Sequence, residues 1–305
     1  MTKRLLNCFA SDIAGYSADQ LLESIRMCEG RVLAAETINT KEPLLNDISN
    51  AEFAASMSAD MIILNFFDAL HPVINGLDET DDSRKIKRLK ELTGRIIGAN
   101  LEPVNDVEKT DSFYKVTPGR VASRENALRC KEMGLDLLVI TGNPGNGVSN
   151  AAIVSSVRTI REMLGRDIMI ACGKLQSSGI LSEMGENIIT REDIDAFIDA
   201  GTDIVILPAP GTVPGIRIDY IHSLISHIHA KEKLAMTSIG TSQEGADSET
   251  IRNIALNAKM AGADIHHIGD TGYVGMALPE NIMNYSIAIR GVRHTYHRMA
   301  SSSKR

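Results

Sequence analysis

The chain has 305 residues, of which 43% are hydrophobic and 23% are charged, and its formal net charge is −7. This size and composition are typical of a globular protein with a sizeable core. The negative charge and the lack of a basic stripe exclude a nucleic-acid-binding protein, and the lack of a long apolar run argues against a membrane partner. With no signal-peptide pattern and no paired cysteine spacing, we expect a cytoplasmic protein with reduced thiols at Cys8, Cys28, Cys130 and Cys172.

The N-terminal region, residues 1–42, is predicted to hold a helix and a short strand that precede the main fold. Ser17 is suited to be the N-cap of a helix over residues 17–27, because Gln20 stands at the capping-box position. Gly30 ends that helix, and the apolar run RVLAAETI follows it. This run is compatible with a strand, and its role stays open at this point.

From residue 43 onward, strand and helix patterns alternate in eight units. The strands are near-continuous apolar runs, as in a parallel sheet whose faces are covered by helices. Several of them follow a glycine and begin with aspartate, which is typical of a helix C-cap and a tight turn into a strand. The predicted strands cover residues 44–48, 61–67, 96–103, 137–143, 167–174, 203–210, 234–241 and 263–270.

Eight successive strand–helix units predict an α/β protein, a single-domain (β/α)8 TIM barrel over residues 43–305. The competing architecture is an open, doubly wound sheet. A dinucleotide-binding sheet of that kind has a G-x-G-x-x-G turn directly after its first strand, and this sequence has none there. The closed barrel is therefore the favoured fold.

A TIM barrel builds its active site from the loops that follow its strands. Polar residues and glycines gather at these positions in the sequence, and we expect them to bind substrate or to carry the chemistry. In strand order they are Asp47; Asn65; Asn100 and Glu102; Thr141 and Asn143; Lys174; Gly211 and Thr212; Gly240, Thr241, Ser242 and Glu244; and His267, Gly269, Asp270 and Gly272.

The loops after the last two predicted strands, GTSQEGAD and GDTGYVG, favour an anion site. Barrel enzymes often hold a phosphate at this place. Glycine-rich backbone and hydroxyl groups can donate hydrogen bonds to an anion, so residues 240–242 and 269–275 are predicted to form its two halves. The alternative is that these glycines only shape tight turns.

Lys174 is the strongest single catalytic candidate in the sequence. A lysine at a strand end can be desolvated in a barrel mouth, which suits it to act as a nucleophile or base. It could also stay charged and pair with a substrate phosphate or with Glu102, or be an ordinary loop lysine. Replacing Lys174 with alanine is expected to abolish turnover if the first interpretation holds.

Carboxylates and a histidine complete the predicted catalytic set. Glu102 and Asp47 are candidate general bases or ligands of Mg²⁺, although no D-x-D pair marks a dedicated metal site. Asp270 beside His267 suggests an oriented imidazole for acid–base chemistry. Since neighbouring residues of a strand face opposite ways, only one of His266 and His267 can face the barrel interior.

Eight sequence segments spread over nearly the whole chain carry a resemblance, namely LLNDISNAE, NLEPV, TGNPGNGVSN, PAPGTVPG, IGTSQEGAD, HHIGDTGYVG, PENI and YSIAIRGVRHTYHRMA. They resemble a family of bacterial proteins of unassigned activity with a TIM-barrel fold, some of which are labelled haloacid-dehalogenase-like hydrolases. That label implies a strand ending in D-x-D-x-[TV], and no strand end here has it. A more distant resemblance is to phosphate-binding barrels and to phosphoenolpyruvate-mutase-like lyases, which implies acidic residues around Mg²⁺ and is partly matched by Asn65, Asn100 and Glu102.

We therefore expect an enzyme that acts on a small anionic, phosphorylated metabolite by lyase, aldolase or isomerase chemistry. One alternative is a hydrolase in which a carboxylate activates water, with Mg²⁺ as an optional cofactor. Another is a barrel that binds a metabolite without turnover. The long and partly apolar last helix favours a homo-oligomer. Fold alone cannot choose between these functions.

Overall fold

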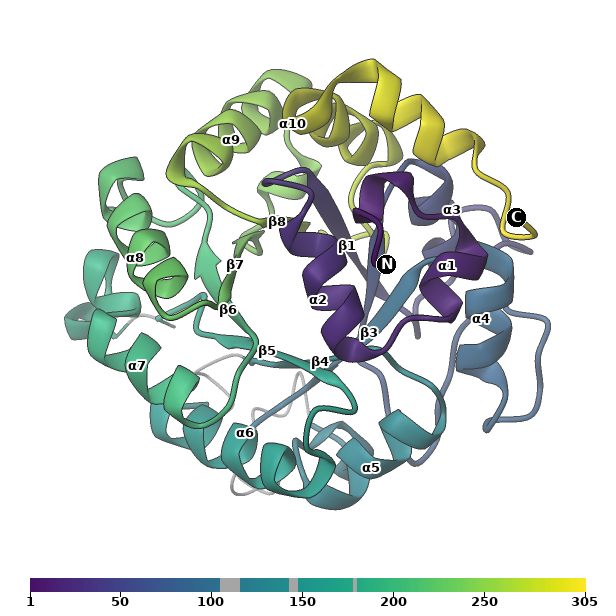
Figure 1. Cartoon of the computed structure of the whole chain (residues 1–305), viewed down its shortest axis with the longest axis horizontal. Coiled ribbons are helices and arrows are strands. Elements are labelled where there is room, and N and C mark those ends of the chain that lie inside the picture. The colour runs from purple at the N-terminus through teal and green to yellow at the C-terminus, as the bar shows by residue number, and fades with distance from the viewer. Residues whose placement is uncertain (105–115, 143–147, 178–179) are drawn as a thin grey trace.

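The computed structural model describes residues 1–104, 116–142, 148–177 and 180–305. Its eight parallel strands form a closed barrel in chain order. β1 (Val32–Ile38) closes the ring by pairing with β8 (Ile265–Ile268), and helices surround the barrel (Figure 1). This arrangement confirms the predicted TIM barrel. No helix in the described part of the chain is long and apolar enough to cross a membrane.

The remaining elements follow one another around the barrel. The strands are β2 (Met61–Asn65), β3 (Ile96–Leu101), β4 (Leu137–Ile140), β5 (Met169–Gly173), β6 (Ile204–Pro208) and β7 (Leu234–Ile239). The helices are α1 (Ala10–Ala14), α2 (Ala18–Arg26), α3 (Asn50–Ser56), α4 (Lys85–Thr93), α5 (Arg124–Glu132), α6 (Asn150–Leu164), α7 (Arg191–Asp199), α8 (Ile218–Ala230), α9 (Ser248–Ala261) and α10 (Pro279–Ala300). Short 3-10 helices are η1 (Leu5–Asn7), η4 (Pro118–Arg120), η6 (Leu181–Glu183), η7 (Gly185–Ile188) and η8 (Gln243–Gly245).

The first strand is RVLAAETI, so the predicted strand at residues 44–48 is wrong and the barrel begins within the predicted N-terminal region. β1 is buried along most of its length and pairs with β2 as well as β8. Residues 44–48 instead form an exposed loop in which Asn46 has a φ of 57°. A left-handed residue interrupts an extended strand, and Asn tolerates that conformation better than most residues.

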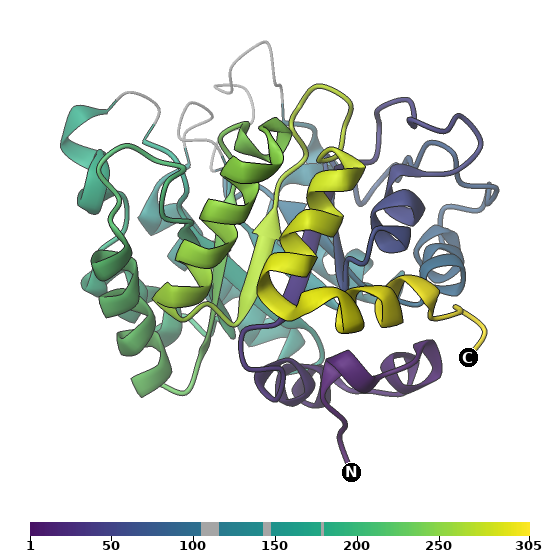
Figure 2. The same cartoon turned by 90° about the horizontal axis from the view of Figure 1, so that it is seen from above.

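Side chains alternate between the barrel interior and the surrounding helices, as the two-residue period of a strand requires. Val32, Met61 and Leu137 belong to the interior cluster, whereas their neighbours Leu33, Ile62 and Leu138 pack against the helices. The N-terminal segment, with α1 and α2, covers the end of the barrel at which the strands begin (Figure 2). Its buried residues therefore join the interior cluster and close that end; they include Leu5, Leu6, Ile13, Leu21 and Ile25.

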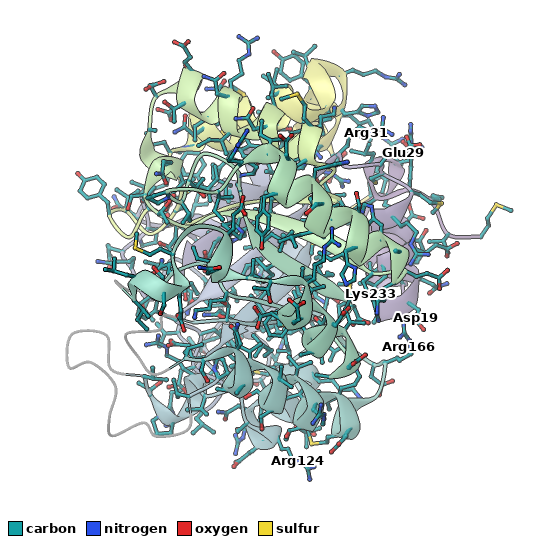
Figure 3. The ribbon with its side chains drawn as sticks, turned by 90° about the vertical axis from the view of Figure 1, so that its left-hand side faces the viewer. Asp19, Glu29, Arg31, Arg124, Arg166 and Lys233 are labelled. Carbon is teal, nitrogen blue, oxygen red and sulfur yellow. The ribbon has the colours of Figure 1, made fainter. Side chains whose placement is uncertain are left out.

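The predicted N-terminal helix is α2, and its capping is as expected. Ser17 accepts a hydrogen bond from the Gln20 N–H, and the Gln20 side chain accepts one from the Ser17 N–H. Asp19 of α2 also forms an ion pair with Arg166, which precedes β5, at the surface of the molecule (Figure 3). This helix is thus held to the barrel by packing on one side and by an exposed ion pair on the other.

Four aspartates repeat one arrangement where the even-numbered strands begin. Each directly precedes its strand and accepts a hydrogen bond from a backbone N–H near the start of the strand before it. Each carboxylate also meets a basic side chain. The sets are Asp60 with Leu33, Arg290 and Arg298; Asp136 with Ile97 and Lys90; Asp203 with Ile170 and Arg161; and Asp264 with Ala235 and His229.

The most buried of these sets surrounds Asp60. α10 bends at Gly291, and Arg290 and Arg298 on the two sides of the bend both reach the Asp60 carboxylate. Arg298 also donates to the carbonyls of Leu5 and Cys8. Asp60 thereby links β1, β2, the C-terminal helix and the N-terminal cap of the barrel.

Candidate functional site

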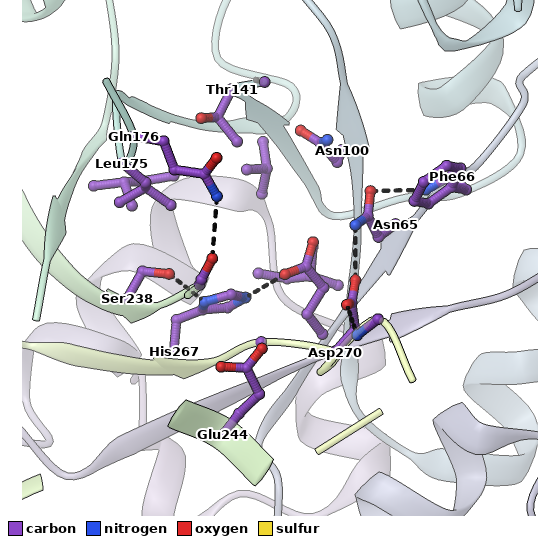
Figure 4. A pocket seen from close by; sticks show the side chains of 18 of the residues that line it. Asn65, Phe66, Asn100, Thr141, Leu175, Gln176, Ser238, Glu244, His267 and Asp270 are labelled. Atoms are coloured by element: carbon purple, nitrogen blue, oxygen red, sulfur yellow. Dashed lines mark hydrogen bonds and ion pairs between the residues drawn. The ribbon is translucent and has the colours of Figure 1, made fainter. Parts of the chain in front are cut away.

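A cavity of about 410 Å³ opens at the end of the barrel where the strands finish. This volume lies in the range of small-molecule sites. Apolar side chains of the barrel interior line it, among them Ile63, Val139, Ile206 and Met236, together with a larger set of polar side chains, several of which are labelled in Figure 4. The polar side chains in its lining are Glu36, Asn65, Asn100, Glu102, Arg120, Thr141, Gln176, Ser238, Ser242, Glu244, His267, Asp270 and Thr271.

His267 faces this cavity and is held on both sides of its ring. The Nδ1 atom lies 2.7 Å from the Ser238 hydroxyl, and the Nε2 atom lies 3.3 Å from a carboxylate oxygen of Glu36. His266 faces the other way and contacts the Tyr285 hydroxyl and the Gly30 carbonyl, where burial lowers its pKa to about 4. The strand alternation that allows only one inward histidine therefore selects His267.

Sequence reasoning missed Glu36 and Ser238. Glu36 was missed because the predicted first strand, at residues 44–48, comes after the true one. The signal was present, since Glu36 is the one charged residue in the apolar run VLAAETI and lies two positions after Ala34, a residue of the interior cluster. Ser238 likewise follows the interior residue Met236 at a spacing of two.

Asp270 does not orient His267, contrary to the prediction; Glu36 lies at that ring instead. One Asp270 oxygen accepts a hydrogen bond from the Asn65 side chain at 2.8 Å, and the other accepts one from the Gly272 N–H at 2.8 Å. Burial, together with the negative charge of Glu36, raises the pKa of Asp270 to about 6. The two hydrogen bonds act in the opposite direction and limit the increase.

Glu244 lies beneath the loop after β8 and is 4% exposed. One carboxylate oxygen accepts a hydrogen bond from the Thr271 N–H at 3.0 Å. The other oxygen is buried and has no hydrogen-bond partner. Burial raises the pKa of Glu244, and the charges of Asp270 and Glu36 add to the increase.

Glu102 and Arg120 form a buried ion pair in the cavity wall. The Arg120 guanidinium also lies over the Phe66 ring, 4.1 Å from its centroid. A guanidinium stacked on an aromatic ring and paired with a carboxylate is fixed in orientation. Arg120, which the sequence did not indicate, is thus a rigid cation in the wall.

The cavity brings together most of the predicted site residues. Those lining it are Asn65, Asn100, Glu102, Thr141, Gly240, Ser242, Glu244, His267, Gly269, Asp270 and Gly272. The predicted residue Asn143 lies outside the described part of the chain.

Five predicted residues do not line the cavity. Lys174 is buried and pairs with Glu183 of η6, because the next residue, Leu175, is the one that faces the cavity. Asp47 is exposed in the loop after β1. Gly211 has a φ of 95° and shapes the turn after β6, where the Thr212 carbonyl accepts a hydrogen bond from the Thr241 hydroxyl.

The two halves of the predicted anion site are adjacent, but carboxylates already occupy part of them. The Thr271 N–H donates to Glu244 and the Gly272 N–H donates to Asp270. These two donors are the kind of group that would bind a phosphate. Within the described residues, no group of three or more His, Cys, Asp or Glu side chains is arranged to hold a metal ion.

Solved structures with a similar fold include an archaeal fructose 1,6-bisphosphate aldolase. It has a TM-score of 0.56 and 13% sequence identity, and the match covers 88% of this chain and 98% of that one. 2,3-dimethylmalate lyase, a member of the phosphoenolpyruvate mutase/isocitrate lyase superfamily, has a TM-score of 0.50 and 14% identity over 83% of this chain and 81% of that one. At these identities the likeness shows the barrel fold.

No curated protein matches the chain in sequence. The sequence pattern of a domain of unknown function, DUF7916, matches residues 6–305. The chain therefore belongs to the DUF7916 family.

Proposed function

We propose that the chain is an enzyme that transfers protons on a small hydroxylated carbonyl compound, by lyase, aldolase or isomerase chemistry. The observation that carries the proposal is a carboxylate with a pKa of about 6, Asp270, in the same cavity as His267, whose ring contacts Glu36 on one side and hydrogen-bonds with Ser238 on the other. Acid–base catalysis needs two enzyme side chains of different pKa that both reach one substrate, one to remove a proton and one to donate a proton. Asp270 is the base in this proposal, and His267 is the source of the returned proton.

Asp270 is suited to be a base because of its hydrogen bonds. Both of its oxygens accept a hydrogen bond, and these donors favour the ionised form of the carboxylate. The raised pKa makes that carboxylate a stronger base than an ordinary aspartate, yet leaves it ionised at neutral pH. It can therefore remove a proton next to a carbonyl group or from a hydroxyl group.

His267 is suited to return a proton through Ser238. Glu36 lies at Nε2 and stabilises a positive charge on the ring. Nδ1 can then donate to the Ser238 oxygen, while the Ser238 hydroxyl donates to an oxygen of the substrate. A histidine held by a carboxylate on one side keeps its orientation during such a transfer.

The charge of the wall limits the substrate. Four carboxylates, Glu36, Glu102, Glu244 and Asp270, line the cavity with a single guanidinium, Arg120, among the described residues. This set favours a compound with one anionic group, near Arg120, over a phosphate ester with two negative charges. The charges of the cavity wall therefore support the phosphorylated substrate that the sequence predicts less well than a compound with one negative charge.

Solvent exchange tests the proposed function even before a product has been identified. Hydroxylated aldehydes, ketones and keto acids, with and without an amino group, are incubated with the protein in D₂O, and loss of the C–H proton signal is followed by NMR. We expect the wild-type chain and the surface variant Glu162→Gln, whose side chain on α6 is 60% exposed, to catalyse the exchange. Wild-type protein that exchanges no compound of this panel would exclude the proposed proton transfer.

The pH dependence of kcat/KM is expected to report on Asp270. Because the ionised carboxylate is the base, kcat/KM should rise as the pH increases through about 6. Asn65→Ala removes a hydrogen bond that lowers this pKa, so the inflection should move to higher pH. Glu36→Gln removes a charge that raises it, so the inflection should move to lower pH. Shifts in the same direction for both variants would rule out Asp270 as the titrating group.

A hydrolase is the second candidate, because Ser238, His267 and Glu36 also have the order of a nucleophile, a base and its orienting carboxylate. The 2.7 Å contact between the Ser238 oxygen and Nδ1 favours this alternative. A fluorophosphonate probe that adds covalently to Ser238, detected by peptide mass spectrometry, would support the hydrolase. No adduct at Ser238 would leave acid–base chemistry as the better account.

A further inference from the structure

One side of the cavity collects three carboxylates from neighbouring elements. Glu36 comes from β1, Asp270 follows β8, and Glu244 lies in η8 after β7. Their contacts bring them together, since Glu244 accepts a hydrogen bond from the Thr271 N–H, directly after Asp270, and Glu36 contacts His267 of β8. The charge of Glu36 accordingly raises the pKa of Asp270, and both charges raise that of Glu244. Like charges gathered in a partly buried place are costly unless a proton or a cation compensates them.

The basic side chains in the described lining of the cavity do not balance the negative charge of these three carboxylates. Arg120 is engaged by Glu102 and lies on the Phe66 ring, on the side of the wall formed by β2, β3 and η4. His267 meets Glu36 but has no hydrogen bond to Glu244 or Asp270 among the described contacts. No lysine lines the cavity in the part of the chain that the structure describes.

A second observation points to a ligand. Glu244 is 4% exposed, lines the cavity and has one carboxylate oxygen without a hydrogen-bond partner. A buried acceptor left unpaired costs free energy, so a ligand that donates to it gains from pairing it. Figure 4 shows Glu244 among the side chains that line the cavity, together with His267 and Asp270.

We propose that the substrate carries a primary ammonium group that is bound by Glu36, Glu244 and Asp270. An ammonium group supplies an N–H donor for the unpaired oxygen of Glu244 and one positive charge that compensates the three carboxylates. A hydroxyl group supplies one donor and no charge, and a phosphate group supplies negative charge, so both match less well. This inference rests on the proposed function, because it assigns the substrate class of the same cavity.

The test compares amines with matched alcohols. D-glucosamine is paired with D-glucose, L-serine with L-glycerate, and ethanolamine with ethylene glycol, and binding to the full chain is measured at pH 7.5 by isothermal titration calorimetry. We expect at least one amine to bind about tenfold or more tightly than its partner, since charge-assisted hydrogen bonds are stronger than neutral ones. Equal binding within every pair, binding of no amine, or tighter binding of glucose 6-phosphate than of glucosamine would overturn the proposal.

Glu244→Gln provides the matched variant. It keeps the shape of the side chain and removes one charge, so the amine that binds should lose about tenfold or more in affinity, whereas Glu162→Gln should leave it unchanged. An unaltered amine affinity in Glu244→Gln contradicts the assignment. The comparison of pairs on wild-type protein does not depend on the folding of this variant.

The two proposals fail separately. Proton exchange in D₂O without a preference for amines would leave the proposed function standing and remove the ammonium site. Selective binding of an amine without exchange of any compound would support the ammonium site and contradict the proposed chemistry.

Discussion

Replacing Asp60 with alanine is expected to lower the free energy of unfolding by about 3–5 kcal/mol, because it leaves two buried arginines without their carboxylate. Arg290 and Arg298 both contact Asp60, and all three side chains are almost fully buried. Equilibrium denaturation in urea, followed by circular dichroism, measures the change. Asp60→Asn should show a loss in the same direction.

The matched control is Asp19→Asn, which removes another aspartate–arginine ion pair, this one with side chains 56% and 59% exposed. Exposed pairs contribute about 0–1 kcal/mol, so this variant should unfold almost as the wild type does. A similar small change for Asp60→Ala would show that the buried pairs do not hold the barrel end together.

Acid should weaken the same contact. Burial alone would raise the pKa of Asp60, but Arg290 and Arg298 hold it below the ordinary value. A carboxyl group whose pKa is lower in the folded state stabilises the fold above its unfolded pKa, and that contribution disappears as the pH falls through the folded value. The difference in stability between wild type and Asp60→Asn is therefore expected to narrow at acidic pH.

Replacing Asp270 with asparagine is expected to reduce kcat/KM by about 10²–10⁴-fold, the usual contribution of a positioned general base. The amide keeps the size of the side chain and can still interact with Asn65, but it cannot take up the proton. The measurement is the rate of C–H exchange or turnover with the compound identified in D₂O. Activity within a few-fold of the wild type would remove Asp270 from the mechanism.

Stability separates this catalytic role from a structural one. The pKa of Asp270 is raised on folding, so its ionised form is less favourable in the folded state, and removing the charge should leave the melting temperature unchanged or higher at pH 7.5. A lower melting temperature with lost activity would indicate that Asp270 supports the fold instead. Catalytic groups commonly cost stability where they are held.

The sequence was informative about the barrel because the signal is repeated. Seven predicted strands correspond to observed ones, since each is a continuous apolar run between a helix end and a polar loop. The first strand was misplaced because LLNDI and RVLAAETI are both short apolar segments next to a turn. Only pairing with β2 and β8, a contact between distant parts of the chain, distinguishes them.

The sequence predicted the location of the candidate site more accurately than the contacts between its side chains. The rule that function lies at strand ends found His267, Asp270, Glu102 and Glu244, because it depends only on the fold. It misjudged Lys174, since being near a strand end does not say which way a side chain points. Alternation from the apolar interior residues would have shown that Leu175 faces the cavity and that Lys174 does not.

The four aspartates at the strand starts give the barrel a period of two strands. Each joins an odd strand to the next even one, and among the described hydrogen bonds no aspartate makes the corresponding link from an even strand to the next odd one. These carboxylates therefore reinforce every second pair of neighbouring strands with a side-chain link, in addition to the backbone pairing that runs around the whole ring.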